Sequence, residues 1–445
     1  MPKLSDIAAM YIGDRSVVKA YRGDQQVWPI VDDSDTSNGD LDLPREAWYG
    51  GSAYYSQFSA AASQGWNNTS FFPFVMFPNS FIGNSEVGWD ARSANVYHGA
   101  NEWSTWQDMS SNGMTWIGGQ LETREDLGGP MPANYPGWVG YAVEDEIDGT
   151  RDNPVNGLAD ASAQVASFNA SATGRFVFAN YTQRILQDAW VKPGGGYWGA
   201  DFVNLPGVDV VCIDMYWYTI PDSSFYNGYV SGGSTVKGPG ARMAGSYGAC
   251  IRATRWLDAQ DGNLKPIWMY IENLSGSPGE QFVRYIEPAE LKAAVMSCIT
   301  NGASGIVWFN NVASSTHYVA NVSRTAQMDA GSPAAARVQA AQEIKTFVES
   351  LAPVINTQSY VWDFGASTID TMLKTYDGYA YIFAVPGTGN GTGPTLGLKT
   401  FQLPSGVTGD IEVIGESRSI TPSGSTFTDT FANEYTWHVY KIALS

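Results

Sequence analysis

The sequence predicts an α/β fold: a (β/α)8 barrel with a small N-terminal β-hairpin module and a C-terminal antiparallel β-sandwich domain. Over about 300 residues, eight short apolar runs alternate with helical patterns, which is typical of repeated βα units. No Gly-x-Gly-x-x-Gly follows the first run, which disfavours a Rossmann domain. The predicted units are a hairpin module at 1–30, an acidic linker at 31–43, the barrel at 44–356 and the sandwich at 357–445.

The composition narrows the classes of partner. The 445 residues carry a formal net charge of −19, which disfavours binding to nucleic acid or to anionic lipid. No apolar run is long enough for a membrane span, so we expect no membrane insertion. Aromatic residues make up 13% of the chain, and their flat faces suit stacking on sugar rings. Three scattered histidines and three isolated cysteines predict no metal site, no disulfide framework and no cofactor.

The first thirty residues contain a short repeat. Tyr11-Ile-Gly-Asp and Tyr21-Arg-Gly-Asp lie ten residues apart, and each Gly-Asp stands between β-formers as a hairpin turn does. The stretch resembles a module found at the start of tail and other virion proteins of bacteriophages. That resemblance implies attachment to other phage tail proteins through residues 1–30. The following linker is acidic and rich in small residues, the composition of a solvated connection.

The barrel elements are assigned in chain order. The eight expected strands are 71–77, 94–97, 114–117, 139–143, 175–179, 208–215, 267–271 and 305–309. Helical patterns lie at 157–169, 241–259, 288–301 and 334–351, and Pro288 and Glu290 suit the first turn of the third. After residue 357, alternating strands such as 379–384, 411–414 and 435–442 predict the antiparallel domain.

Acidic side chains end two of these strands. Reactive groups of a (β/α)8 barrel project from the C-terminal strand ends. Glu144, Asp145, Glu146 and Asp148 follow the fourth strand, and Glu272 ends the seventh after six mostly apolar residues. A carboxylate at the end of a buried strand is costly unless it has a task. Two such groups suit glycosidic cleavage, which needs a proton donor and a nucleophile.

Here the chain resembles the clan A glycoside hydrolases, whose acid/base follows strand four and whose nucleophile ends strand seven. Asp145-Glu146-Ile147-Asp148 is similar to their Asp-Glu-Pro-Asp-like motif, which implies Glu146 as acid/base and Glu272 as nucleophile. Ile147 replaces the usual proline, and Asp145 stands where much of the clan has asparagine. Glu144 competes with Glu146, because strand alternation places both on one side. We expect Glu146 to hold the proton and Glu272 to be ionised near physiological pH.

Further strand ends supply candidate sugar contacts. The resemblance implies a tyrosine beside the nucleophile at strand six and a tryptophan platform at strand eight, and Asp214 is open to a structural role or to pairing with Glu272. The candidate substrate-binding residues are Glu144, Asp145, Tyr216, Trp217, Trp308, Asn180, Asn310, His98 and Gln120.

Together, these observations and resemblances predict a bacteriophage minor tail protein. Its barrel would bind and cleave a host cell-surface or cell-wall polysaccharide by a retaining mechanism. A non-catalytic receptor-binding tail protein is the alternative. The N-terminus has no secretory signal, so we expect a virion protein made in the host cytoplasm. Its oligomeric state, including a homo-oligomer, is open.

Overall fold

The computed structural model describes most of the chain. It covers the short strands between residues 10 and 28, and residues 41–445 apart from 79–87, 99–105, 119–136, 152, 172, 188, 221–241, 275, 277–281, 311–324 and 328. The side chains of the strands between residues 10 and 28, of 106–108 and of 390 also lie outside the description.

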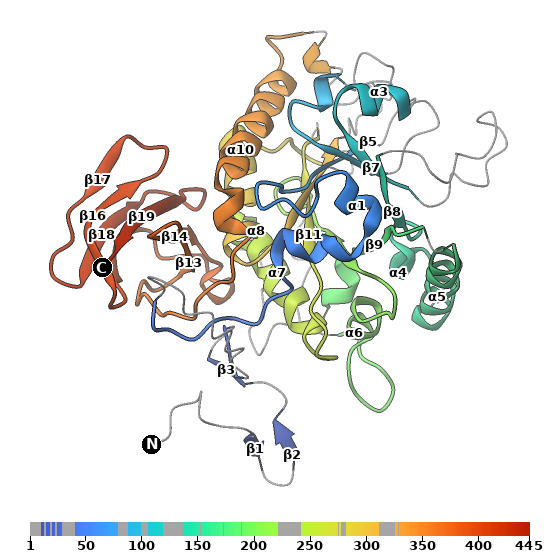
Figure 1. The fold of residues 1–445 in the computed structure, drawn as a ribbon, viewed down its shortest axis with the longest axis horizontal. Coiled ribbons are helices and arrows are strands. Elements are labelled where there is room, and N and C mark those ends of the chain that lie inside the picture. Colours follow the sequence, from blue (N-terminus) through green and yellow to red (C-terminus); the bar gives the residue numbers. More distant parts are fainter. Residues whose placement is uncertain are drawn as a thin grey trace.

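Eight parallel strands close into a barrel, which confirms the predicted fold class (Figure 1). In chain order they are β5 (Phe74–Pro78), β6 (Val96–His98), β7 (Thr115–Ile117), β8 (Trp138–Ala142), β9 (Phe176–Thr182), β10 (Val210–Asp214), β11 (Ile267–Glu272) and β12 (Gly305–Asn310). Each strand pairs with its neighbour in sequence, and β12 pairs with β5. The strands are continuous apolar runs because both faces are buried.

Side chains alternate between two apolar layers along each strand. On β11, Trp268 and Tyr270 fill the barrel interior, whereas Met269 and Ile271 face the surrounding helices. The same alternation places Phe309 of β12 inside and Trp308 outside. This alternation decides which side chains at the strand ends can reach the barrel mouth.

Helices cover the outside of the barrel. The described helices are α1 (Ser59–Ser63), α3 (Trp106–Ser111), α4 (Ile147–Thr150), α5 (Pro154–Ala170), α6 (Trp198–Val203), α7 (Ala244–Asp258), α8 (Pro288–Thr300) and α10 (Pro333–Ile355), with 3-10 turns η2 (Gly51–Gln57) and η5 (Gln183–Leu186). The predicted first turn of α8 is present: Pro288 opens the helix, and Glu290 accepts a hydrogen bond from the backbone N–H of Glu287 at 2.8 Å. Among the described helices, none is both long and apolar enough to cross a membrane.

The C-terminal domain is antiparallel, as predicted. A five-stranded sheet has the order β13 (Ile369–Tyr376), β14 (Tyr379–Pro386), β19 (His438–Leu444), β16 (Val407–Val413) and β17 (Arg418–Ile420). A short 3-10 turn, η8 (Gly389–Gly391), precedes a two-stranded ribbon of β15 (Gly397–Gln402) and β18 (Thr426–Phe431). Their shared core includes the stacked rings of Phe401 and Phe427. Figure 1 shows α10, α8 and α7 between the barrel and this domain.

Residues near the N-terminal end of the described main body pack on the C-terminal domain. Leu41, in the last part of the predicted linker, is buried in that domain's core. Arg45 pairs with Tyr360 through an isolated bridge and a 2.8 Å hydrogen bond. Farther upstream, β1 (Met10–Ile12) pairs with β2 (Arg15–Val17), and β3 (Ala20–Arg22) pairs with β4 (Gln25–Trp28), which are the two predicted hairpins.

Candidate active site

The chain makes a sharp turn where it leaves β8. Glu146 adopts a left-handed backbone conformation (φ 54°, ψ 34°) and immediately precedes α4. This conformation costs a non-glycine residue on the order of 1 kcal/mol, and it concentrates at functional sites. The buried side chains of Ile147 and Asp148 anchor the turn. The backbone N–H of Glu146 donates to the carbonyl of Asn180 on the neighbouring β9 at 3.3 Å.

This turn separates Glu144 from Glu146. The Glu144 carboxylate accepts hydrogen bonds from both terminal nitrogens of Arg151, at 2.9 and 2.5 Å, and a weaker one from Gln164 of α5. The expectation that strand alternation places both glutamates on one side is wrong, because β8 ends at Ala142 and alternation stops there. Glu144 therefore pairs with the helical layer, and Glu146 turns toward the strand ends.

Glu146 meets a second acid from β10. Its carboxyl group lies within hydrogen-bonding reach of the Asp214 carboxyl at the end of that strand. Asp214 is 6% exposed, whereas Glu146 is partly exposed. Burial, followed by the contact with Glu146, raises the pKa of Asp214 well above its usual range. The raised pKa favours the protonated form of Asp214, because a second carboxyl group this close makes ionisation of Asp214 more costly.

Asp145 and Asn180 lie beside this pair. The Asn180 side-chain amide donates to Asp145 at 2.9 Å, and its side-chain oxygen is buried with no hydrogen-bond partner in the described part of the chain. Asp145 itself is exposed, so solvent screens its charge. Even so, desolvation by the surrounding protein raises the pKa of Asp145 to about 6; the hydrogen bond from Asn180 opposes this shift, and the charge of Glu146 adds to it. These contacts place Asp145 on the wall of the barrel mouth.

Asp148 has a structural position. It is 1% exposed and accepts hydrogen bonds from the backbone N–H and the hydroxyl of Thr182, at 2.9 and 2.6 Å. Burial raises its pKa to about 7 against the effect of these bonds. Asp148 therefore ties α4 to the end of β9.

Glu272 ends β11 and is fully enclosed. Its Oε1 accepts a 2.5 Å hydrogen bond from the Tyr247 hydroxyl of α7 and a 2.8 Å bond from the backbone N–H of Tyr218. Among the described residues, its Oε2 has no hydrogen-bond partner, and neither does the side-chain amide of the adjacent, buried Asn273. Burial raises the pKa of Glu272 to about 7, although both bonds lower it. We expected Glu272 to be ionised near physiological pH, and a pKa of about 7 leaves it only partly ionised at pH 7.

Tyr216 links the two acidic groups. Its partly buried ring stacks on Phe309 at 5.0 Å and meets the edge of Phe282. Burial raises the pKa of Tyr216 well above its usual range, and the charges of Asp214, Glu146, Asp145 and Glu272 all act in the same direction. Tyr216 thus lies within electrostatic reach of acids from β8, β10 and β11. The hydroxyl that bonds Glu272 nevertheless belongs to Tyr247, which sequence reasoning missed because its position in a helix marks it as core.

Two predicted tryptophans face away from the mouth. Trp308 is fully buried between the barrel and the helices, where its indole N–H donates to the carbonyl of Ser93 at 2.8 Å. Trp217 is also fully buried in this outer layer. Neither ring is placed to support a sugar, since the alternation on β12 turns Phe309 inward instead.

The remaining candidates have varied positions. His98 is 3% exposed inside the barrel, where its Nδ1 pairs with the Tyr270 hydroxyl at 2.9 Å; burial lowers the pKa of His98 to about 3. Asn310 is fully buried at the end of β12. Gln120 lies outside the described residues. In the described part of the chain, no group of three or more His, Cys, Asp or Glu side chains is arranged as metal ligands.

Comparisons with known proteins return structures but no sequence matches. A scan against protein families and a search of curated proteins both find none. Solved structures that resemble the chain include a GH30 endoxylanase from Clostridium papyrosolvens (12% identity, TM-score 0.41, covering 84% of this chain and 97% of that one). They also include an alpha-amylase from Geobacillus thermoleovorans (10%, 0.44, 84% and 98%). A third is a family 51 alpha-L-arabinofuranosidase from Bifidobacterium longum (10%, 0.43, 83% and 95%).

All three similar proteins are glycoside hydrolases by name. At these identities and TM-scores, the likenesses carry no argument about the reaction of this chain. Any functional conclusion has to come from its own side chains.

Proposed function

We propose that the barrel is a retaining glycoside hydrolase, carried by a bacteriophage minor tail protein, that binds and cleaves a host surface or cell-wall polysaccharide. The observation that carries this proposal is the placement of acids around Tyr216. Glu146, Asp214 and Glu272 all contribute to the raised pKa of Tyr216, and we assign Glu146 as the proton donor and Glu272, at the end of β11, as the nucleophile. The exposed carboxylate of Asp145 offers a hydrogen-bond acceptor to sugar hydroxyl groups.

The proposed first step uses both acids. Ionised Glu272 attacks the anomeric carbon, the bond to the leaving oxygen breaks, and Glu146 transfers its proton to that oxygen. Asp214 supplies a neighbouring carboxyl group within hydrogen-bonding reach of Glu146. In the second step, Glu146 accepts a proton from water, the water oxygen bonds the anomeric carbon, and Glu272 is released.

The enclosure of Glu272 favours a second candidate function. Its side chain has no exposed surface, and one oxygen already accepts two hydrogen bonds. A barrel that binds glycan without turnover is consistent with this arrangement. Such a protein would serve as a receptor-binding tail component.

Reducing-sugar release distinguishes the two functions. The full chain would be incubated with host cell-wall and capsular glycans beside Glu272→Gln, Glu146→Gln and Glu144→Gln. We expect the first two variants to lose at least about 10²-fold in rate and the third to retain activity, because Arg151 occupies the Glu144 carboxylate. Glycan binding without release by the parent would support the receptor-binding function instead. Activity that persists in Glu272→Gln would refute its assignment as nucleophile.

The tail assignment is tested separately. We propose that residues 1–30, which contain the two hairpins, attach the protein to other tail components. Immunodetection in purified phage particles should find the full chain but not a chain that lacks these residues. Absence of both from the particles would refute the virion location without affecting the enzymatic proposal.

A further inference from the structure

A loop of the C-terminal domain reaches the barrel next to Glu272. The loop between β18 and β19 carries Glu434, whose carboxylate accepts a hydrogen bond from the Tyr218 hydroxyl, with both oxygens at 2.9 Å. The same carboxylate accepts the backbone N–H of Ala244, the first residue of α7, at 2.8 Å. Burial raises the pKa of Glu434, and these two bonds oppose the shift. Glu434 therefore joins the segment after β10 to the start of α7.

The same two segments hold Glu272. The backbone N–H of Tyr218 and the hydroxyl of Tyr247 both donate to its Oε1. The rings of Tyr218 and Tyr247 stack with their centroids 5.8 Å apart. Tyr218 thus bonds Glu434 through its hydroxyl and Glu272 through its backbone. A shift of Tyr218 would displace one of the two donors that bond Glu272, and a shift of the α7 N-terminus would displace the other.

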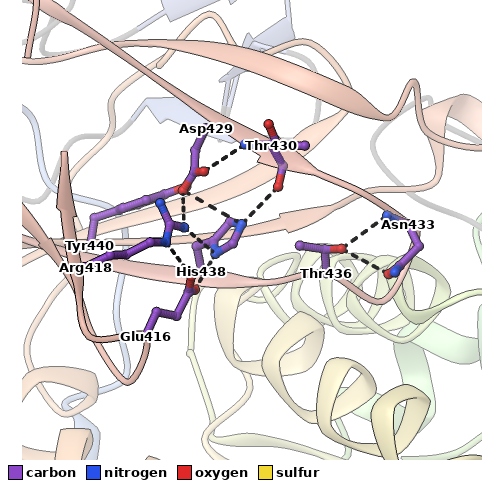
Figure 2. Close-up of polar contacts among 8 residues, drawn as sticks. All are labelled: Glu416, Arg418, Asp429, Thr430, Asn433, Thr436, His438 and Tyr440. Atoms are coloured by element: carbon purple, nitrogen blue, oxygen red, sulfur yellow. Dashed lines mark hydrogen bonds and ion pairs between the residues drawn. The ribbon is translucent and has the colours of Figure 1, made fainter.

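The loop itself is fixed at its base. The Thr436 hydroxyl donates to the Asn433 side chain at 3.0 Å and accepts the Asn433 backbone N–H at 3.2 Å, which closes a tight turn around Glu434 (Figure 2). On the adjacent strands, His438 bonds Glu416, and Arg418 pairs with Asp429. Figure 2 shows this charged cluster beside the turn, within one small region of the domain. Glu434 therefore extends to the barrel from a hydrogen-bonded turn.

We propose that Glu434 is a positioning residue that holds Glu272 in place from the C-terminal domain. The nucleophilic role of Glu272 rests on the proposed function, whereas the coupling between Glu434 and Glu272 does not. A domain that serves only as packing would need no carboxylate at this contact. In particular, it would not need one whose burial is costly and whose partners also bind Glu272.

Hydrogen exchange in the full chain tests the coupling without an activity assay. Glu434→Ala removes both contacts, Glu434→Gln keeps the size and an acceptor, and Glu412→Ala serves as a matched control because the Glu412 side chain is 62% exposed. We expect the amides of Tyr218 and of the first turn of α7 to exchange roughly tenfold faster in Glu434→Ala, in line with the loss of buried hydrogen bonds to a charge. Glu434→Gln should restore most of the protection, and Glu412→Ala should leave it unchanged.

The pH profile gives a second readout. The bonds from Tyr247 and Tyr218 lower the pKa of Glu272, so loosening them should raise it further. In Glu434→Ala, the acidic limb of the kcat/KM profile should therefore move up by about half a pH unit or more, with partial recovery in Glu434→Gln.

The outcomes separate the two proposals. No hydrolysis by the parent would refute the proposed function, yet faster exchange in Glu434→Ala would still support the coupling. Unchanged exchange at both segments in a folded Glu434→Ala protein would overturn the coupling, whatever the activity. Equal effects of Glu434→Ala and Glu412→Ala would overturn it as well.

Discussion

Replacing Glu272 by glutamine should stabilise the protein at alkaline pH while abolishing the proposed activity. Glutamine retains the Oε1 acceptor for Tyr247 and Tyr218 but cannot ionise. The folded-state pKa of Glu272 is about 7, against an ordinary value of 4.5. Because the folded value is the higher one, the stability due to the protonated carboxyl is fully present below pH 4.5 and is lost as pH rises through 7.

The size of the effect follows from these two values. Between pH 5 and pH 8, a group with this shift removes about 2.5 kcal/mol from the free energy of unfolding of the parent, and the Gln variant is spared that loss. Burial is complete and no cation lies among the causes of the shift, so solvent screening does not reduce it. The stability difference between variant and parent should therefore grow in favour of the variant as pH rises.

Urea unfolding at pH 5 and pH 8, followed by tryptophan fluorescence, measures this difference. Glu412→Gln is the control. Because the Glu412 carboxylate is exposed, the free energy of unfolding of this variant should change between the two pH values as that of the parent does. A stability difference between Glu272→Gln and parent that is independent of pH would refute the reasoning. It would mean that folding leaves the pKa of Glu272 at its ordinary value of 4.5.

Two further substitutions test the placement of other side chains. Trp308→Phe should lower the free energy of unfolding by about 2 kcal/mol, through lost volume and an unpaired Ser93 carbonyl, yet leave KM for glycan unchanged; a raised KM without loss of stability would contradict its outward position. Lys374 is 4% exposed, and burial lowers its pKa to about 7; the charge of Glu46 opposes this shift and that of Arg255 adds to it. The charged side chain therefore lowers the free energy of unfolding in full below pH 7, and this loss disappears as the pH rises toward 10.5. The stability of Lys374→Met relative to the parent, measured by urea unfolding, should fall by about 3 kcal/mol between pH 7 and pH 10, and a constant difference would contradict the burial of the charge.

The barrel could be predicted from sequence because its strands are buried on both faces. Runs such as 267–271 are apolar throughout, and the helical patterns between them set the parallel connections. The position of Glu272 followed directly, since it is the first charged residue after such a run. The strand endings were the weak point. Alternation could not place Glu146, because β8 ends at Ala142 and Glu146 itself has a left-handed backbone conformation.

The platform assigned to Trp308 failed for a related reason. An apolar run shows that a strand is buried. Because both of its faces are hydrophobic, the sequence does not show which alternate residues point into the barrel. Only closure of the barrel against the helices decides that Phe309 faces the interior. Aromatic residues at strand ends are therefore weak indicators of a sugar contact unless a polar neighbour fixes the parity.

Contacts between the domains lay beyond sequence reasoning altogether. Tyr218 and Glu434 are 216 positions apart, and neither stands in a motif. Neither residue indicates a special role by its position in the sequence: Tyr218 is an aromatic residue after a barrel strand, and Glu434 is an acid in a turn between β-strands. Their importance lies in the partly buried hydrogen bond that joins them and in the second bond, from the backbone of Tyr218 to Glu272. If this connection governs Glu272, the C-terminal domain belongs to the catalytic unit, and exchanging it for another sandwich without a carboxylate at this position should disturb the site even when the barrel folds.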